Sequence, residues 1–221
     1  MCCVSICKIS KYEEVIILEI HSRNCSAKDT YKLLSGLVVP RPIALVSSKD
    51  AQGRSNVAPF SFFNVVANEP PTVMFSADKR KGEKKDTIAN IETHTEFVIN
   101  IVSEKMAQKM HNSAADFKKE VSEFDEVGLT PIAAQTINCD AVKESLAHLE
   151  CKLDRIIKVG KSFMILGEVV HFSVDDQVYL SDYKIDIEKL QPLARLAGRE
   201  YGRIHERFEL ERKFDPTKVI E

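Results

Sequence analysis

The distribution of apolar positions along this 221-residue chain indicates a series of short β-strands separated by turn residues. Runs rich in apolar and β-branched residues predict strands at 42–48, 60–66, 72–76, 96–102, 147–159, 162–172 and, more briefly, 178–180. The polar segment 49–53 ends in glycine and predicts a hairpin turn after the first strand. Closely spaced strands of this kind favour a closed or split β-barrel over a parallel sheet.

Only two short segments have the spacing of helices. We expect the first to begin at Asp86 or Thr87, either of which is a good N-cap, and the second to begin after Ser103. Residues 120–138 show no regular pattern, so we expect an irregular segment there. The predicted fold class is mainly β with short helices, a β-barrel or α+β protein.

The length of the chain suits one domain with a sizeable core. We predict that this domain spans residues 29–205, between a flexible N-terminal extension at 1–28 and a charged C-terminal tail at 206–221. Four of the six cysteines, at positions 2, 3, 7 and 25, lie in the extension, and their spacing matches no usual zinc-ligand pattern. We expect Cys139 and Cys151 to be small buried residues.

Charge and motif content exclude several functional classes. Lys and Arg number 31 against 33 Asp and Glu, and they are spread along the chain, which argues against nucleic acid as the main partner. The longest apolar runs fall short of a membrane span or a signal peptide, so we expect a cytoplasmic protein. The chain has no G-x-S-x-G, P-loop, G-x-G-x-x-G or H-E-x-x-H motif, which removes most hydrolase and nucleotide-fold interpretations.

A basic loop at residues 78–87 precedes the first predicted helix. It carries five cationic side chains, and the free N–H groups of a helix start beside Lys or Arg favour an anion such as a phosphate. Lys85 can contribute a point charge and Thr87 a hydroxyl group. A solvated lysine-rich loop is the alternative interpretation.

Segment 53–64 places small and polar residues among aromatic ones where a barrel strand should be uniformly apolar. Small side chains allow backbone groups to approach the edge of a planar heteroaromatic ligand, and Asn56 and Ser61 can supply hydrogen bonds. The alternative is a strand that is merely kinked at Pro59.

Several ordered blocks together resemble a known family. These blocks include 39–48, 56–63, Pro70-Pro71, 85–90, 96–100, 122–124, 128–131, 149–151, 167–169 and 195–201. In this order and approximate spacing, over about residues 29–210, they are similar to the flavin reductase-like, FMN-binding split-barrel family, which is associated with flavoprotein oxygenases.

The resemblance implies a homodimer of split barrels with one FMN per subunit near the dimer interface. The flavin ring would lie against 56–61 and along 76–78, and its phosphate would lie near the basic loop. The cofactor-binding residues carried over are Arg41, Asn56, Ala58, Pro59, Phe60, Ser61, Ser76, Ala77, Asp78, Arg80, Lys85, Asp86, Thr87, Arg195 and Tyr201. The nicotinamide would approach an open face bordered by Phe62 or Tyr201, for both of which plain core packing is the alternative.

The implied activity is transfer of a hydride from NAD(P)H to flavin, as the reductase partner of a monooxygenase. Because the flavin carries the chemistry, no catalytic side chain and no metal are expected. The smaller reductases of this group resemble each other in a C-terminal histidine segment that helps to seat the nicotinamide, and here residues 197–201 contain no histidine. The alternatives are an FMN-binding electron carrier or flavin store without NAD(P)H turnover, and a structural dimer with an empty site.

Overall fold

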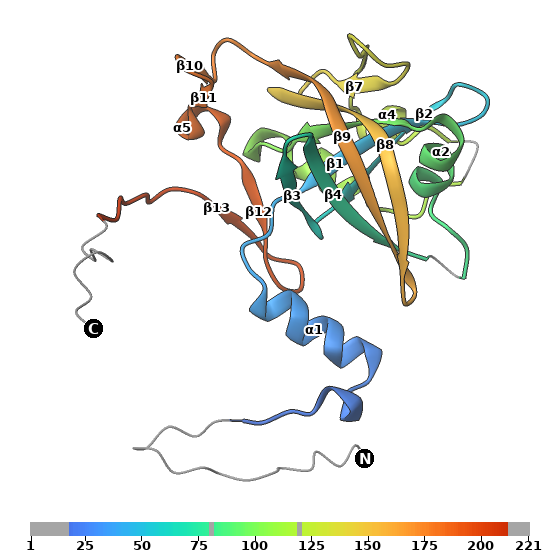
Figure 1. Ribbon diagram of the computed structural model, residues 1–221, viewed down its shortest axis with the longest axis vertical. Coiled ribbons are helices and arrows are strands. Elements are labelled where there is room, and N and C mark those ends of the chain that lie inside the picture. The colour runs from blue at the N-terminus through green and yellow to red at the C-terminus, as the bar shows by residue number, and fades with distance from the viewer. Residues whose placement is uncertain (1–17, 80–81, 119–120, 212–221) are drawn as a thin grey trace.

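A single antiparallel sheet of seven strands forms the body of the protein, in the order β2-β1-β5-β8-β9-β4-β3. The computed structural model describes residues 18–79, 82–118 and 121–211 (Figure 1). The strands are β1 Ala44–Lys49, β2 Ser55–Phe60, β3 Phe63–Asn68, β4 Pro71–Asp78, β5 Glu96–Ile101, β8 Ala147–Val159 and β9 Ser162–Val174. Ser61 and Phe62 join the two edge strands, β2 and β3, so the sheet curls into a split barrel.

Short helices and three small strand pairs surround the barrel. The helical elements are η1 Ser22–Asn24, α1 Ala27–Leu37, α2 Asp86–His94, η2 Glu104–Met106, α3 Ala107–Asn112, α4 Glu123–Val127 and α5 Ile187–Leu190. The pairs are β6 Pro131–Ala133 with β7 Asp140–Val142, β10 Tyr179–Leu180 with β11 Lys184–Ile185, and β12 Leu193–Arg195 with β13 Tyr201–Arg203. Helix α1 projects away from the barrel beside the β12–β13 hairpin (Figure 1). Within the described ranges, every helix is too short or too polar to cross a membrane.

Strand β1 is buried on both faces, which explains its continuous apolar run. Ala44 and Val46 belong to the cluster that fills the barrel, together with Ile88 and Ile91 of α2. Leu45 points to the other face and belongs to a second cluster, built with η2, α3 and α4. Helices α2 and α4 are therefore held against the β1–β2 hairpin from opposite sides.

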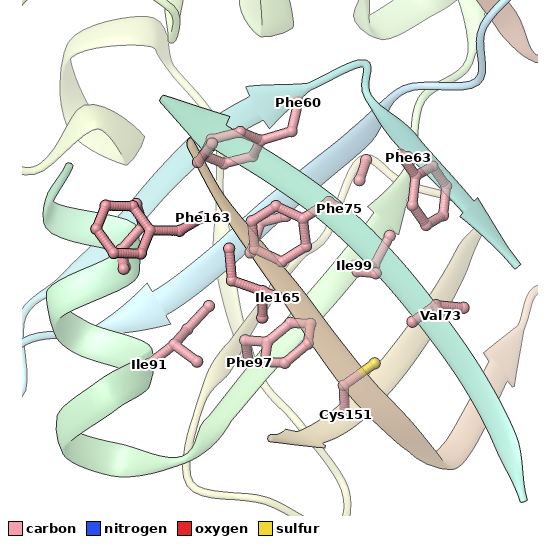
Figure 2. Packing of buried hydrophobic residues seen from close by; sticks show 14 of the residues in the cluster. Phe60, Phe63, Val73, Phe75, Ile91, Phe97, Ile99, Cys151, Phe163 and Ile165 are labelled. Carbon is pink, nitrogen blue, oxygen red and sulfur yellow. The ribbon is translucent and has the colours of Figure 1, made fainter. Parts of the chain in front are cut away.

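Phe75 lies in the middle of the barrel core (Figure 2). Its ring centroid is 4.8 Å from that of Phe60 and 5.7 Å from that of Phe97, in tilted and edge-to-face arrangements. A Cβ atom at Gly167 would lie 2.4 Å from the Phe97 ring, so only glycine fits at this position of β9.

The structure confirms the hairpin at 49–53 and the predicted strands at 42–48, 72–76, 96–102, 147–159 and 162–172, with small shifts at their ends. The prediction of one strand over 60–66 was wrong, because the chain breaks at Ser61-Phe62 between β2 and β3. The second arm of the predicted hairpin is β2, whose bounds were not predicted because Asn56, Ala58 and Pro59 interrupt its apolar pattern. Pro59 fits there because β2 is an edge strand, where a missing N–H breaks no ladder on the open side.

The helix predictions were partly wrong, because only two helices were expected and α1, the longest helix of the described residues, was not among them. The N-cap of α2 is Lys85, not Asp86 or Thr87, and the Thr87 hydroxyl donates to Asn56 instead of capping its own helix. Ser103 does precede the second helical segment, which starts as a 3₁₀ turn. The segment predicted to be irregular, 120–138, contains α4 and β6, which are too short to show a periodicity.

The predicted extension at 1–28 lies outside the described residues up to position 17, and its described part contains η1 and the first turn of α1. Cys2, Cys3 and Cys7 therefore lie outside the described residues, whereas Cys139 and Cys151 are buried as predicted. Residues 206–211 of the predicted tail form an exposed segment without regular structure, and 212–221 are outside the described ranges.

Candidate functional site

A cavity of about 360 Å³ opens between the end of β2, the start of α2 and segment 113–118. Six of the residues predicted to bind the cofactor line it: Asn56, Ala58, Pro59, Lys85, Asp86 and Thr87. The structure thus brings together the two segments that the sequence singled out separately, the small and polar stretch of β2 and the basic loop before α2. The remaining walls are formed by Glu83, Lys84, segment 113–118 and Glu123.

The start of α2 supplies the positive side of the cavity. Lys85 occupies the N-cap position, where its ammonium group cannot accept a hydrogen bond from the first-turn N–H groups of the helix. The Lys85 ammonium lies 5.0 Å from the ring centroid of Phe60, and the Lys84 ammonium forms an ion pair with Glu92 at 2.6 Å. This arrangement of helix start and lysines favours an anionic ligand.

Three side chains from three elements form a hydrogen-bonded chain in the wall of the cavity. The Thr87 Oγ1 donates to Asn56 Oδ1 at 3.1 Å, and Asn56 Nδ2 donates to Glu123 Oε1 at 2.7 Å. Thr87 is 1% exposed, which fixes its hydroxyl at this point. Helix α4 is held in place because the Ser122 hydroxyl donates to the backbone oxygen of Ser55 at 3.1 Å.

Glu123 is a carboxyl group in a desolvated position. Burial raises its pKa above the ordinary value, and the nearby carboxylate of Asp86 acts in the same direction. Hydrogen bonds from the N–H groups of Glu123 and Val57 and from the Asn56 amide oppose the shift without cancelling it.

A smaller cavity of about 180 Å³ lies on the other side of this wall. The two cavities share Asn56, Asp86, Lys118 and Glu123 as lining residues. Glu123 and Asn56 therefore lie between two cavities and are not packed into the hydrophobic core.

Two other predicted residues, Arg195 and Tyr201, meet on the β12–β13 hairpin. The Arg195 guanidinium lies 4.7 Å from the centroid of the Tyr201 ring and donates to the backbone oxygens of Gly198 and Glu200. The Tyr201 hydroxyl is 2.9 Å from His111 Nδ1, on α3. Segment 197–201 lacks a histidine of its own, but α3 brings one to it.

Arg41 is 6% exposed and connects three parts of the chain. Its guanidinium donates to the backbone oxygens of Ser35 and Val38 at the end of α1 and of Leu196 after β12. It also lies 5.8 Å from the ring centroid of Phe62. This geometry holds α1 and the C-terminal hairpin together, and Arg41 does not line the cavity.

The remaining predicted residues lie apart from the cavity lining. Phe60 and Ala77 are buried in the barrel core, Ser61 lies in the bend between β2 and β3, and Ser76 lies on β4. Asp78 accepts a hydrogen bond from the hydroxyl of Ser162. Arg80 lies outside the described residues.

Sequence reasoning missed Glu123 and segment 113–118 as parts of the site. The available signal for Glu123 was its place in block 122–124, which resembles the family. A glutamate by itself does not indicate a role. Segment 113–118 has no distinctive composition, and it reaches the cavity only because α3 ends beside β2.

Comparison with known proteins identifies a family over most of the chain. The family model described as "Flavin reductase like domain" matches residues 35–209. An uncharacterized protein, YwrF, from Bacillus subtilis is 38% identical over 192 residues, which cover 84% of this chain and 94% of that protein. An uncharacterized protein from Aquifex aeolicus is 41% identical over 172 residues, which cover 77% of this chain and 88% of that protein.

Solved structures agree with this assignment. Nitrilotriacetate monooxygenase component B from Bacillus cereus superposes with a TM-score of 0.86 at 37% identity, covering 89% of this chain and all of that one. The 2-nitrobenzoate 2-nitroreductase NbaA from Pseudomonas fluorescens gives a TM-score of 0.81 at 31% identity, covering 92% and 98% of the two chains. This chain therefore belongs to the flavin reductase-like domain family and has its split-barrel fold.

Proposed function

We propose that this protein binds FMN in the 360 Å³ cavity and acts as an NAD(P)H-dependent flavin reductase that supplies a monooxygenase with reduced flavin. One observation supports the site. Lys85 and Thr87, at the start of α2, line the same cavity as the small residues Ala58 and Pro59. The flavin reductase-like family and its split-barrel relatives support the activity.

The residues present fit an FMN molecule. The cavity volume lies within the roughly 300–1,000 Å³ of small-molecule sites. One end of the cavity offers the anion-binding groups, a lysine, a buried hydroxyl and helix N–H groups. Ala58, Pro59 and Ala114 along the lining present small side chains against which a planar ring can lie.

Each part of the chain has a distinct task in this proposal. Lys85 and Thr87 hold the phosphate, and β2 holds the ring through its backbone and the small side chains of Ala58 and Pro59. When bound, FMN supplies a hydride-accepting ring, so the protein has to place the partners and exclude water. We assign placement of the nicotinamide to Tyr201 with His111, because the Tyr201 hydroxyl lies 2.9 Å from His111 Nδ1 and α3 thereby brings a histidine to segment 197–201.

The comparisons guide the choice of substrate and partner. The Bacillus cereus relative is named as component B of a nitrilotriacetate monooxygenase, which supports an oxygenase as the acceptor of the reduced flavin. The Pseudomonas fluorescens relative is named as a nitroreductase, which supports a reductase activity. An FMN-dependent electron carrier is the second candidate, and the lack of a histidine in segment 197–201 favours it.

A homodimer is part of the proposal. Helix α1 exposes Tyr31, Leu34 and Leu37 by 54%, 51% and 78%, and the β3 edge exposes Val65 by 68%. The Tyr31 ring stacks on Phe62 at 6.5 Å, which places this apolar helix beside the β2–β3 bend. A second copy that covers these side chains would remove them from water, which supports a dimer interface on this side of the protein.

Titration of the purified protein with NADH or NADPH in the absence of oxygen tests the function. With FMN added, a reductase bleaches the yellow flavin absorbance rapidly and repeatedly as more flavin is supplied. If flavin binds but its absorbance persists through excess nicotinamide, the protein is an electron carrier or flavin store. If FMN does not bind at all, the assignment of the cavity is wrong.

A further inference from the structure

The direction of the hydrogen bonds between Thr87, Asn56 and Glu123 follows from the chemistry of the last of them. An ionised carboxylate only accepts hydrogen bonds, so Glu123 obliges Asn56 to present Nδ2 to it, at 2.7 Å. The other end of the amide, Oδ1, then faces Thr87, and the single hydroxyl hydrogen of Thr87 is donated to it at 3.1 Å. The chain therefore runs from Thr87 to Asn56 to Glu123.

This direction conflicts with the task that the proposed function gives to Thr87. A phosphate dianion carries no hydrogen, so Thr87 can bind it only by donating. With its hydrogen directed at Asn56, Thr87 presents lone pairs to the cavity. Turning the hydroxyl to the phosphate would leave the acceptor Oδ1 of the half-buried Asn56 without this donor, which is unfavourable.

Protonation of Glu123 removes the conflict. A neutral carboxyl group can donate its hydrogen to Asn56 Oδ1 once the amide turns over. Asn56 Nδ2 then faces Thr87 and donates to Oγ1, and the Thr87 hydrogen is released to the ligand. All three links are retained, each with its direction reversed.

We propose that Glu123 is a positioning residue that takes up one proton from solvent when an anionic group binds at Thr87, and thereby reverses the hydrogen-bonded chain. This inference rests on the proposed FMN site. The ligand chemistry concerned is a phosphate dianion, and the groups that change are the chain's own carboxyl, amide and hydroxyl.

The surroundings of Glu123 support uptake of a proton. Asp86 on α2 is a like charge that disfavours the carboxylate, and Lys118 lines both cavities with it. From the β1–β2 turn, Asp50 and Arg54 line the smaller cavity and form an ion pair with each other at 2.7 Å. The pKa of Glu123 is already raised by burial before any anion arrives, and an incoming dianion would raise it further.

Helix α3 packs against α4, but its charged side chains are engaged elsewhere. Lys109 binds the backbone oxygen of Gly128 and forms an ion pair with Glu144 at 3.1 Å, and His111 binds Tyr201. The charged side chains of α3 therefore do not pair with Glu123.

The test compares wild-type protein with Glu123→Gln, in which the Gln amide can donate as the protonated carboxyl would. Dissociation constants for FMN and for riboflavin, which lacks the phosphate, are measured by flavin fluorescence between about pH 5.5 and 9. We divide the dissociation constant of the wild type for FMN by that of Glu123→Gln. This ratio should rise with pH, by up to about tenfold for each pH unit. Titration of the phosphate itself cancels in this ratio, and the riboflavin ratio should stay flat.

Two further measurements separate this role from a merely structural one. Calorimetry of FMN binding in buffers of different ionisation enthalpy should show up to one more proton taken up by the wild type than by Glu123→Gln. Glu123→Ala, which cannot donate, should bind FMN more weakly than Glu123→Gln at every pH. Glu126→Gln, an exposed substitution on the same helix, should match the wild type in both affinity and proton uptake.

A flat FMN ratio, or equal proton uptake by both proteins, overturns the inference while leaving the cavity assignment intact. Failure of the proposed function gives a different result. In that case the double variant Lys85→Glu, Thr87→Ala would lose affinity equally for FMN and riboflavin, or the wild type would bind neither.

Discussion

Replacement of Thr87 by valine isolates the contribution of one hydroxyl group to ligand selection. Valine has nearly the same shape as threonine, and Thr87 is 1% exposed, so Thr87→Val leaves the packing of α2 almost unchanged. The variant removes the donor that lies 3.1 Å from Asn56 Oδ1. Because Asn56 keeps its bond to Glu123 and is only half-buried, we expect a loss of about 1 kcal/mol in the free energy of unfolding.

The effect on FMN should be larger than the effect on stability. A hydrogen bond to a charged group contributes about 1.5–3 kcal/mol, which corresponds to a roughly 10- to 150-fold increase in the dissociation constant for FMN. The dissociation constant for riboflavin should change by less than about twofold, because riboflavin has no phosphate to lose a donor. Fluorescence titration of both flavins measures the two constants on the same protein.

Thr87→Ser is the matched control, since it restores the hydroxyl group, and it should recover most of the preference for FMN over riboflavin. An equal loss of affinity for the two flavins in Thr87→Val would refute the assignment of Thr87 to the phosphate. So would an unchanged affinity for FMN.

Three predictions concern the scaffold. Gly167→Ala places a Cβ 2.4 Å from the Phe97 ring and should lower the free energy of unfolding by about 1–3 kcal/mol, with Phe97→Leu partly restoring stability in denaturant titrations. Arg41→Met removes the donors to three backbone oxygens and should cost about 2–4 kcal/mol, while the ratio of FMN to riboflavin affinity stays at the wild-type value if Arg41 does not contact the phosphate. Burial alone would raise the pKa of Glu150, but hydrogen bonds from Thr136 and Gln135 hold it below the ordinary value, so its stabilisation is present above about pH 4.5 and is lost as the pH falls further. The melting temperature of Glu150→Gln should therefore lie below that of the wild type at neutral pH and approach it in acid.

The barrel was largely predictable because its long strands have clear patterns. Strand β8 carries its own pattern over thirteen residues, and the glycine-containing turn after β1 marks the hairpin. The bounds of strand β2 were less clear because small and polar residues interrupt its apolar alternation, and three of them, Asn56, Ala58 and Pro59, line the 360 Å³ cavity. The same residues carry the proposed flavin site.

The site was predictable only in its local parts. The basic loop and Thr87 could be identified because the helix start and the charges lie within ten residues of one another. The link from Thr87 through Asn56 to Glu123 joins positions that are 31 and 67 residues apart, and only the packing of α2 and α4 against β2 brings them together. The role of Arg41 was hidden for the same reason, since its partner Leu196 lies 155 residues away.

A crystal structure of the protein with FMN tests the central claim most directly. We predict the phosphate within hydrogen-bonding distance of Thr87 Oγ1 and of the first N–H groups of α2, with the ring against Ala58 and Pro59. A structure in which the flavin binds elsewhere and this cavity holds only water would contradict the account.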